Sequence, residues 1–232
     1  MNIPDFEKEK IISQEFLPIG VDEVGRGPLA GSVVAAAVLY KDAAFTVPEE
    51  LEKQFGWIRD SKKLSEKKRE VMFEFIHEHF YVGIGIISAE TIDRVNILQA
   101  TFLAMKSAVT DLKRSIPKEI DKPIYLLIDG NQLLPSFSGM QEAVVQGDSK
   151  VRSIAAASII AKVTRDRLCE EYDREYPQYG FVRHKGYGTK EHMDALKHFG
   201  ATAIHRKSFK PVQLTNPDLV NKKFNHILKP KK

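Results

Sequence analysis

Two apolar segments near the start of the chain, residues 16–24 and 31–40, are separated by a short turn rich in glycine. Each segment has the length and composition of a buried strand, and the connection is too short for the crossover that parallel strands need. The two segments are therefore expected to pair as antiparallel neighbours in a sheet. Asp22 and Glu23 lie at the end of the first segment, just before the turn.

Strand and helix patterns alternate along the rest of the chain, which is typical of an α/β domain. Apolar residues at helical spacing follow Ser65, which can cap a helix, and lead into a strand at residues 81–87. A helix at residues 97–112 precedes a strand at 124–128. The other expected elements are a strand at about 143–146 and helices at 149–176, from Thr189 to Gly200, and from a cap at Asn216 with Pro217 in the first helical position.

Acidic residues accompany the ends of predicted strands at three places. Asp22 and Glu23 end the first strand, Asp129 follows the apolar run IYLLI, and Asp148 follows the last strand. Functional sites in α/β sheets gather near strand ends, so these four carboxylates are expected to converge. Four negative charges in a small volume need cations and suit two hard divalent ions such as Mg²⁺ or Mn²⁺. Because neighbouring residues of a regular strand face opposite sides, we expect an irregularity or a side-on approach by Glu23.

Each acid also has a purely structural interpretation, in which Asp22 and Glu23 only end a strand at a glycine turn. Asp129 can form a turn with the glycine after it, and Asp148 can cap the following helix. Asp166 competes with Asp148, because the two are five turns, or about 27 Å, apart on one predicted helix, and only one of them can join a compact site. Asp166 lies between Arg165 and Arg167 and is interpreted as a surface ion-pair residue, which favours Asp148.

The composition, with 43% hydrophobic and 28% charged residues among 232, is typical of one globular domain. The N-terminal sequence MNIPDFEKEK is too polar for a secretory signal, and an apolar run such as residues 32–40 is too short to cross a bilayer. The single cysteine, Cys169, fits a reducing compartment. A cytoplasmic location is expected.

Positive charge is concentrated at the C-terminal end of the chain. Residues 201–232 carry eight Lys or Arg and one acid, whereas the preceding residues carry 27 basic and 30 acidic side chains. We expect a domain at residues 1–200, followed by a basic helical extension at 201–232. The extension favours a polyanionic partner and added phosphate contacts, although a solvated helix explains the charge equally well.

Six motifs that occur in order between about residues 17 and 212 closely resemble ribonuclease HII. They are DEVGRGPLAG at 22–31, DSKKLS at 60–65, the pair Asp129-Gly130, GDSKVRSIAAASIIAKVTRD at 147–166, HKGYGT at 184–189 and the stretch 205–212. The resemblance implies an α/β ribonuclease H-like fold, with a mixed central sheet flanked by helices. It also implies an endonuclease that hydrolyses the RNA strand of RNA/DNA hybrids and cleaves 5′ to single ribonucleotides in duplex DNA, with roles in DNA replication and repair. The implied mechanism uses two metal ions and leaves 5′-phosphate and 3′-hydroxyl ends.

The resemblance also assigns roles to individual residues. The catalytic, metal-binding acids that it implies are Asp22, Glu23, Asp129 and Asp148. The substrate-binding residues that it implies are Gly25, Arg26, Gly27 and Tyr187, which sense the ribose 2′-hydroxyl. Ser61, Lys62 and Lys63 are expected to face the nucleic-acid backbone, with Ser158 near the site, although the two lysines also fit ordinary solvated side chains. His184 and His205 are either structural or general bases, and two-metal chemistry requires no histidine.

The resemblance implies a monomer. Some members of the family reach a replication clamp through the C-terminus, but residues 220–232 show no clamp-binding pattern. A ribonuclease HIII-type enzyme would share the chemistry, yet the likeness starts about twenty residues from Met1 and leaves no space for an extra N-terminal domain. A resolvase or integrase-like nuclease would not explain the glycine-arginine-glycine turn with Tyr187. A non-catalytic hybrid-binding module would not need four acids.

Overall fold

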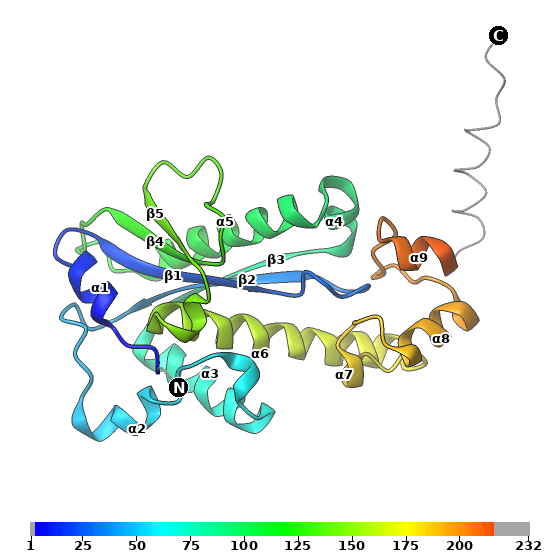
Figure 1. The fold of residues 1–232 in the computed structure, drawn as a ribbon, viewed down its shortest axis with the longest axis horizontal. Coiled ribbons are helices and arrows are strands. Elements are labelled where there is room, and N and C mark those ends of the chain that lie inside the picture. Colours follow the sequence, from blue (N-terminus) through cyan, green and yellow to red (C-terminus); the bar gives the residue numbers. More distant parts are fainter. Residues whose placement is uncertain (1–2, 216–232) are drawn as a thin grey trace, which may run out of the picture. The chain divides into compact units, whose positions relative to one another are not determined.

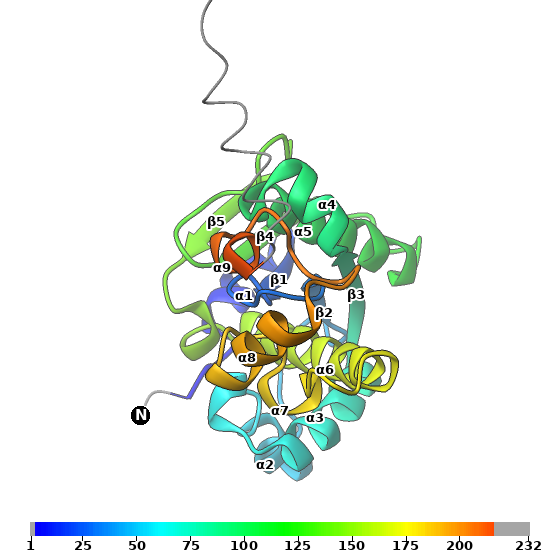
Figure 2. The same cartoon turned by 90° about the vertical axis from the view of Figure 1, so that its right-hand side faces the viewer.

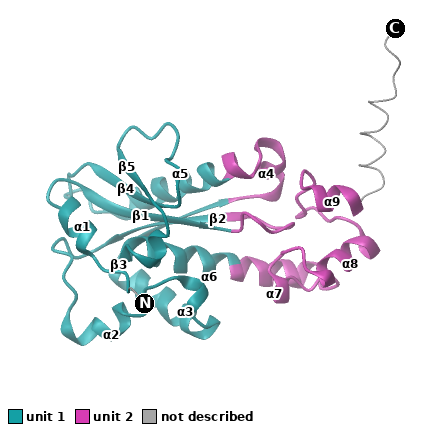
Figure 3. Ribbon diagram, viewed as in Figure 1, with its two compact units in different colours: residues 1–24, 34–86, 101–165 teal, residues 25–33, 87–100, 166–232 magenta. Residues whose placement is uncertain are grey.

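The computed structural model describes residues 3–215. The chain divides into two compact units (Figure 3). Unit 1 contains residues 1–24, 34–86 and 101–165, and unit 2 contains residues 25–33, 87–100 and 166–232. The glycine-arginine-glycine turn therefore belongs to unit 2, whereas the strand that precedes it belongs to unit 1.

A five-stranded sheet forms the centre of unit 1, in the order β3-β2-β1-β4-β5 (Figure 1). The strands are β1 Leu17–Val24, β2 Val33–Tyr40, β3 Phe80–Ile87, β4 Ile124–Asp129 and β5 Met140–Val144. β1 pairs with β2 antiparallel and with β4 parallel, and β4 pairs with β5 parallel. The sheet is therefore mixed, and the predicted antiparallel pair is confirmed. The last strand ends two residues earlier than predicted, and Gln146 adopts a left-handed backbone conformation, incompatible with a strand, directly before the 3₁₀ turn at residues 147–149.

Helices cover both faces of this sheet (Figures 1 and 2). The helices that lie wholly or mainly in unit 1 are α1 Glu7–Ile12, α2 Glu52–Phe55, α3 Glu66–His79, α5 Ile97–Ser115 and the first part of α6 Arg152–Glu175. α5 lies on one face, and α3 and α6 lie on the other. Close approach requires glycine on both faces, since a Cβ on Gly85 would collide with the α5 backbone at Ala104 and one on Gly20 with the α6 backbone at Ser153.

Helix caps confirm part of the sequence interpretation. The hydroxyl of Ser65 accepts the N–H of Lys68 at the start of α3, and the hydroxyl of Thr189 accepts the N–H of His192 at the start of α8. α8 ends before Gly200, as predicted. Helix α1 and helix α4 Ala89–Val95 are not predicted from the sequence, because they are too short for a clear apolar period.

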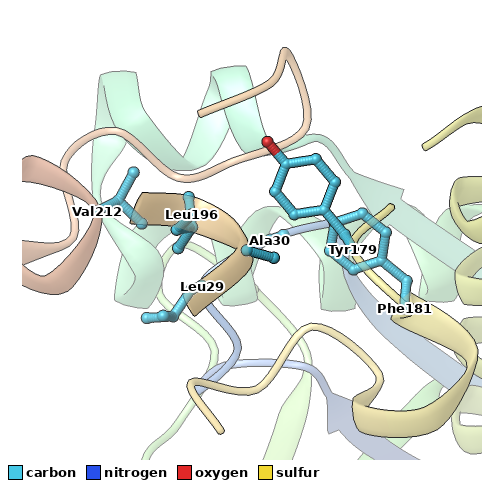
Figure 4. Close-up of a cluster of buried hydrophobic side chains, with 7 residues drawn as sticks. Leu29, Ala30, Tyr179, Phe181, Leu196 and Val212 are labelled. Carbon is cyan, nitrogen blue, oxygen red and sulfur yellow. The ribbon is translucent and has the colours of Figure 1, made fainter. Parts of the chain in front are cut away.

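Unit 2 has its own hydrophobic cluster (Figure 4). Its other helices are α7 Phe181–His184, α8 Lys190–Phe199 and α9 Lys210–Thr215. Leu29 and Ala30 from the turn segment pack in one cluster with Phe181, Leu196 and Val212. Residues on both sides of position 200 thus share a core within unit 2, and the domain boundary placed there stays a prediction. The helix expected from Asn216 lies outside the described residues.

Within the described part of the chain, no helix combines the length and the apolar character needed to cross a membrane.

Candidate functional site

Strand register brings two of the predicted acids to neighbouring positions near the C-terminal ends of strands β1 and β4. Val21 on β1 is paired with Ile128 on β4, so Asp22 and Asp129 each follow a paired residue on parallel strands. Asp129 in turn pairs with Val144 at the end of β5, and Asp148 follows in the turn after that strand. The three aspartates therefore come from three adjacent strand ends of unit 1.

Asp22 is the most deeply buried of these acids. Its side chain is 6% exposed, and its Oδ1 accepts the backbone N–H of Glu23 at 2.7 Å. Burial, followed by the negative charges of Glu23 and Asp129, raises the pKa of the Asp22 carboxyl well above its usual value. A hydrogen bond from the Ser158 side chain opposes that shift. The hydrogen bonds thus fix the orientation of the Asp22 carboxyl, whereas burial and the neighbouring negative charges disfavour its ionised form.

Ser61 forms the next part of this hydrogen-bond chain. Its hydroxyl lies 3.0 Å from that of Ser158, and both side chains are buried. An ionised Asp22 can only accept, so in that state Ser158 donates its hydrogen bond to Asp22 and Ser61 donates to Ser158. The Ser61 hydroxyl, which is expected from the sequence to face the nucleic-acid backbone, is therefore engaged inside unit 1.

Asp129 and Asp148 are connected through the turn between β5 and α6. Asp129 Oδ1 accepts the N–H of Gly147 at 2.7 Å, and Asp148 lies in the 3₁₀ turn Gly147–Ser149. Burial, then the charge of Asp129 and that of Asp60, raises the pKa of the Asp148 carboxyl. The two carboxylates are therefore close enough to repel each other.

A basic turn lies beside Asp148. The positive charges of Lys62 and Lys63 counteract the upward shift of the Asp148 pKa, so their ammonium groups lie within electrostatic range of this carboxyl. Both lysines are exposed, and Asp60 holds the turn by accepting the N–H of Lys62 at 3.0 Å. Lys63 Nζ also pairs with Asp60 Oδ2 at 3.5 Å, and the two exposed lysines place positive charge next to the acids, where a phosphate group could be bound.

The donor set fits divalent metal ions. Carboxylate oxygens are the ligands that Mg²⁺ and Mn²⁺ prefer, and the raised pKa values of Asp22 and Asp148 show negative charge that a cation would neutralise. Among residues 3–215, no three His, Cys, Asp or Glu side chains already form a group with metal-ligand spacing. The four-acid metal site thus stays a prediction that the sheet register and the charge coupling support.

The interpretation of Asp166 as a surface residue is wrong. Asp166 is 4% exposed and Arg165 is 1% exposed, since Val163 and Cys169, three residues to either side of Asp166 on α6, are also buried. Asp148 precedes α6, so the two aspartates do not share one helix as expected. Arg165 and Arg167, which flank Asp166 in the sequence, suggested an exposed helix face. Val163 and Cys169, about one turn away on either side, show that Asp166 lies on the buried face.

The glycine-arginine-glycine turn and Tyr187 meet within unit 2. Gly25 has a φ of +94°, in the left-handed region that favours glycine. A Cβ on Gly27 would lie 3.4 Å from Cε1 of Tyr187, so the tyrosine ring lies directly beside this glycine. The Tyr187 side chain is 47% exposed, and Arg26 and Gly27 are exposed too. Along the chain, only Val24 separates Glu23 from the turn.

His184 and His205 are buried and have structural hydrogen bonds. His184 Nε2 lies 2.8 Å from the carbonyl oxygen of Tyr179, and its Nδ1 accepts the N–H of Gly186 at 3.2 Å. His205 Nε2 lies 3.0 Å from Nε2 of His192. Neither His192 nor Arg206 is marked as a site residue by the sequence pattern, and both are fully buried.

Comparison with known proteins identifies similar chains. The family model described as Ribonuclease HII matches residues 19–212. The ribonuclease HII of Fusobacterium nucleatum is 53% identical over 192 residues, which cover 82% of this chain and 84% of that protein. The ribonuclease HII of Bacillus subtilis is 51% identical over 195 residues, which cover 84% of this chain and 69% of that protein.

Solved structures confirm the expected ribonuclease H-like fold. The structure of the PCNA:RNase HII complex from Archaeoglobus fulgidus contains a chain with a TM-score of 0.66 and 25% identity, covering 84% of this chain and 96% of that one. The Bst-RNase HIII structure in complex with Mn²⁺ has a TM-score of 0.67 at 17% identity, covering 87% and 69%, and supports the fold alone. Residues 220–232, where the sequence shows no clamp-binding pattern, lie outside the described part of this chain.

Proposed function

The chain belongs to the ribonuclease HII family and is a ribonuclease H, and we propose that it hydrolyses the RNA strand of RNA/DNA hybrids and cleaves 5′ to single ribonucleotides embedded in duplex DNA. The observation that carries this proposal is the coupling of Asp22, Asp129 and Asp148 at three adjacent strand ends. Nucleic acid is the substrate class. We further propose that the protein works as a monomer in the cytoplasm.

The catalytic part of the site consists of carboxylates held by unit 1. Asp22, Glu23, Asp129 and Asp148 would hold two divalent ions, Mg²⁺ or Mn²⁺. When bound, such ions activate a water molecule and stabilise the leaving oxygen of a phosphodiester. The hydrogen bond from Glu23 N–H to Asp22 and that from Gly147 N–H to Asp129 each occupy one carboxylate oxygen and fix its orientation.

The proposed reaction follows from attack of water on phosphorus. The new bond joins the water oxygen to phosphorus, and the bond from phosphorus to the 3′ oxygen breaks. The 3′ oxygen takes up a proton, so the products are a 3′-hydroxyl and a 5′-phosphate. The exposed ammonium groups of Lys62 and Lys63 beside Asp148 support a role in binding the phosphate backbone. We assign the buried hydroxyl of Ser61 to orienting Asp22 through Ser158, and not to substrate contact.

Ribose recognition is assigned to unit 2. The turn of Gly25, Arg26 and Gly27, of which Arg26 and Gly27 are exposed, would contact the ribose that follows the scissile bond, together with the Tyr187 ring beside Gly27. The 2′-hydroxyl is the group that distinguishes ribose from deoxyribose, and backbone amides or carbonyls can hydrogen-bond to it. An aromatic ring can stack on the adjoining sugar, which would exclude water from that contact.

Cleavage of a DNA duplex with one internal ribonucleotide tests this proposal. With Mg²⁺ or Mn²⁺ present, the wild type is expected to cut 5′ to the ribonucleotide and to leave an all-DNA duplex and single-stranded RNA intact. Asp129→Asn is expected to lose cleavage by roughly 10²-fold or more while it keeps most of its substrate affinity. Cleavage of all-DNA would contradict the proposal in favour of a resolvase-like nuclease. Tight hybrid binding without cleavage would indicate a binding module.

A further inference from the structure

Arg206 lies fully buried in unit 2, beneath the glycine-arginine-glycine turn. Its guanidinium donates to four backbone carbonyls of the segment 25–31. Nε donates to Gly31 at 3.0 Å, one terminal nitrogen donates to Arg26 at 2.9 Å and Pro28 at 2.8 Å, and the other donates to Gly25 at 2.6 Å. The planar guanidinium of Arg206 thus binds four of the backbone carbonyls in this segment at once.

This arrangement determines where the amides of the turn point. In a trans peptide the C=O and the following N–H point in opposite directions, and the described residues contain no cis peptide bond. With the carbonyls of Gly25 and Arg26 directed at the guanidinium, the N–H groups of Arg26 and Gly27 point away from it. Both residues are exposed, so these amides lie on the side of the turn that a substrate can reach.

The residues next to Arg206 tie the same segment to its neighbours. The backbone N–H of Arg206 donates to the carbonyl of Leu29 at 2.8 Å, and His205 forms an antiparallel bridge with Ala30. The N–H of Leu29 donates to the carbonyl of Gly186 at 2.8 Å, directly before Tyr187. Leu29 and Ala30 also pack in the hydrophobic cluster of unit 2 (Figure 4).

A pair of histidines holds Tyr187 itself. His205 Nδ1 accepts the N–H of Thr202 at 2.9 Å, so in the neutral ring the proton must lie on Nε2. That Nε2–H donates to His192 Nε2 at 3.0 Å, which places the His192 proton on Nδ1. His192 Nδ1–H then donates to the carbonyl of Tyr187 at 2.9 Å. The hydrogen bonds of both rings are thereby used to hold the backbone that carries the tyrosine.

We propose that Arg206, together with the His205–His192 pair, acts as the positioning element for ribose recognition, because these residues hold the amides of the turn and the backbone of Tyr187 in one rigid arrangement. This inference rests on the proposed function, in which the turn and Tyr187 contact the ribose. Arginine suits this task because its planar fork offers five N–H donors in fixed directions. Lysine keeps the positive charge, but its three donors all belong to one ammonium group at the end of a flexible chain. It therefore cannot donate to four separated carbonyls.

A buried arginine also contributes to folding, so the test must separate positioning from stability. Leu196→Ala provides the matched control, because Leu196 is fully buried in the same unit 2 cluster. Its removal is expected to lower the urea midpoint without redirecting the turn. Arg206→Lys tests the fork at constant charge. His192→Gln places its amide near the former Nε2, so it is expected to lose the donor to Tyr187 while keeping contact with His205.

The measured quantity is ribose discrimination, defined as the inhibition constant of an all-DNA duplex divided by the KM for the same duplex with one ribonucleotide. Arg206→Lys is expected to lower this ratio and kcat by roughly tenfold or more, because a misplacement of about 1 Å in a positioned contact can cost about 10²-fold. His192→Gln is expected to lower the ratio as well. Leu196→Ala is expected to retain the wild-type ratio at temperatures where it is folded.

Amide hydrogen exchange of the segment 25–31 gives a second readout that does not depend on activity. Faster exchange in Arg206→Lys than in Leu196→Ala, at matched unfolding free energy, is the expected result. Wild-type discrimination and exchange in a folded Arg206→Lys would overturn the inference and leave the proposed function intact. An equal loss of discrimination in Leu196→Ala would also overturn it. If the wild type itself does not discriminate ribose, the proposed function falls and this inference falls with it.

Discussion

The hydroxyls of Ser61 and Ser158 lie 3.0 Å apart inside unit 1, and the Ser158 hydroxyl also forms a hydrogen bond with the carboxylate of Asp22. This relationship connects the turn that carries Lys62 with the most buried of the acids. A carboxylate that must hold a cation gains from such a bond, because the bond fixes its direction before the cation arrives.

Ser158→Ala is expected to reduce cleavage by roughly tenfold, because Asp22 loses its side-chain donor. The free energy of unfolding is expected to fall by about 1 kcal/mol, the typical value of one buried hydrogen bond. Single-turnover cleavage and urea unfolding measure the two effects. Thr164→Ala is the control on the same helix, since the Thr164 hydroxyl donates only to the carbonyl of Ile160. Equal activity of the two variants would contradict a role for Ser158 at the site.

Lys62→Ala is expected to weaken binding of hybrid and of DNA duplex to a similar degree, because a phosphate contact carries no base information. The slope of log Kd against log salt is expected to become shallower by about one. Fluorescence anisotropy at several salt concentrations measures this slope. Lys118→Ala serves as the control, since Lys118 is also exposed but follows α5 at residue 115. An unchanged slope in Lys62→Ala would place this lysine outside the interface.

Much of the acidic site could be predicted from the sequence because its signals are local. An acid after a run such as IYLLI is tied to the end of a buried strand, and parallel pairing of β1 and β4 then determines its neighbour. Gly147 N–H and Ser158 could not be assigned to their partners in this way, since these contacts join residues that only the fold brings together.

Arg206 shows why the remainder could not be predicted. In the sequence it is one of eight basic residues after position 200, and that composition favours an exposed, phosphate-binding extension. In the structure it is buried and its donors reach backbone carbonyls 175 or more residues away in the chain. A backbone carbonyl has no side-chain signature, so no residue pattern marks it as a partner. An interpretation based on charge alone therefore predicts an exposed position for Arg206, as it does for Asp166, although both residues are buried.

Divalent ions are expected to stabilise the folded protein as well as to support cleavage. Bound cations would neutralise the negative charge that raises the pKa values of Asp22 and Asp148, and this favours the folded state. At an ion concentration of 100 times Kd, the free energy of unfolding is expected to rise by about 2.7 kcal/mol. Thermal unfolding with and without Mg²⁺ measures this gain. Asp129→Asn should lose most of it, whereas Asp121→Asn, at an exposed position, should keep it. An equal rise of Tm in both variants would indicate non-specific ion binding.

Acid is expected to destabilise the protein through His205. Burial, followed by the charges of His192 and His184, lowers the pKa of His205 from 6.5 to about 3. Because the folded state binds the proton more weakly than the unfolded state, the stabilising contribution is fully present above pH 6.5 and is lost as the pH falls toward 3. The slope for one such group is at most about 1.4 kcal/mol per pH unit.

Urea unfolding between pH 7.5 and about 4.5 tests this expectation. His205→Asn keeps an acceptor for Thr202 but has no titrating ring, so it should be less stable than the wild type at pH 7 and should lose stability less steeply in acid. His198→Gln, at an exposed position, should follow the wild-type curve. Equal slopes for wild type and His205→Asn would show that the acid sensitivity arises elsewhere. Burial lowers the pKa of His192 too, so a residual slope in His205→Asn is assigned to His192 and should disappear in the double variant with His192→Gln.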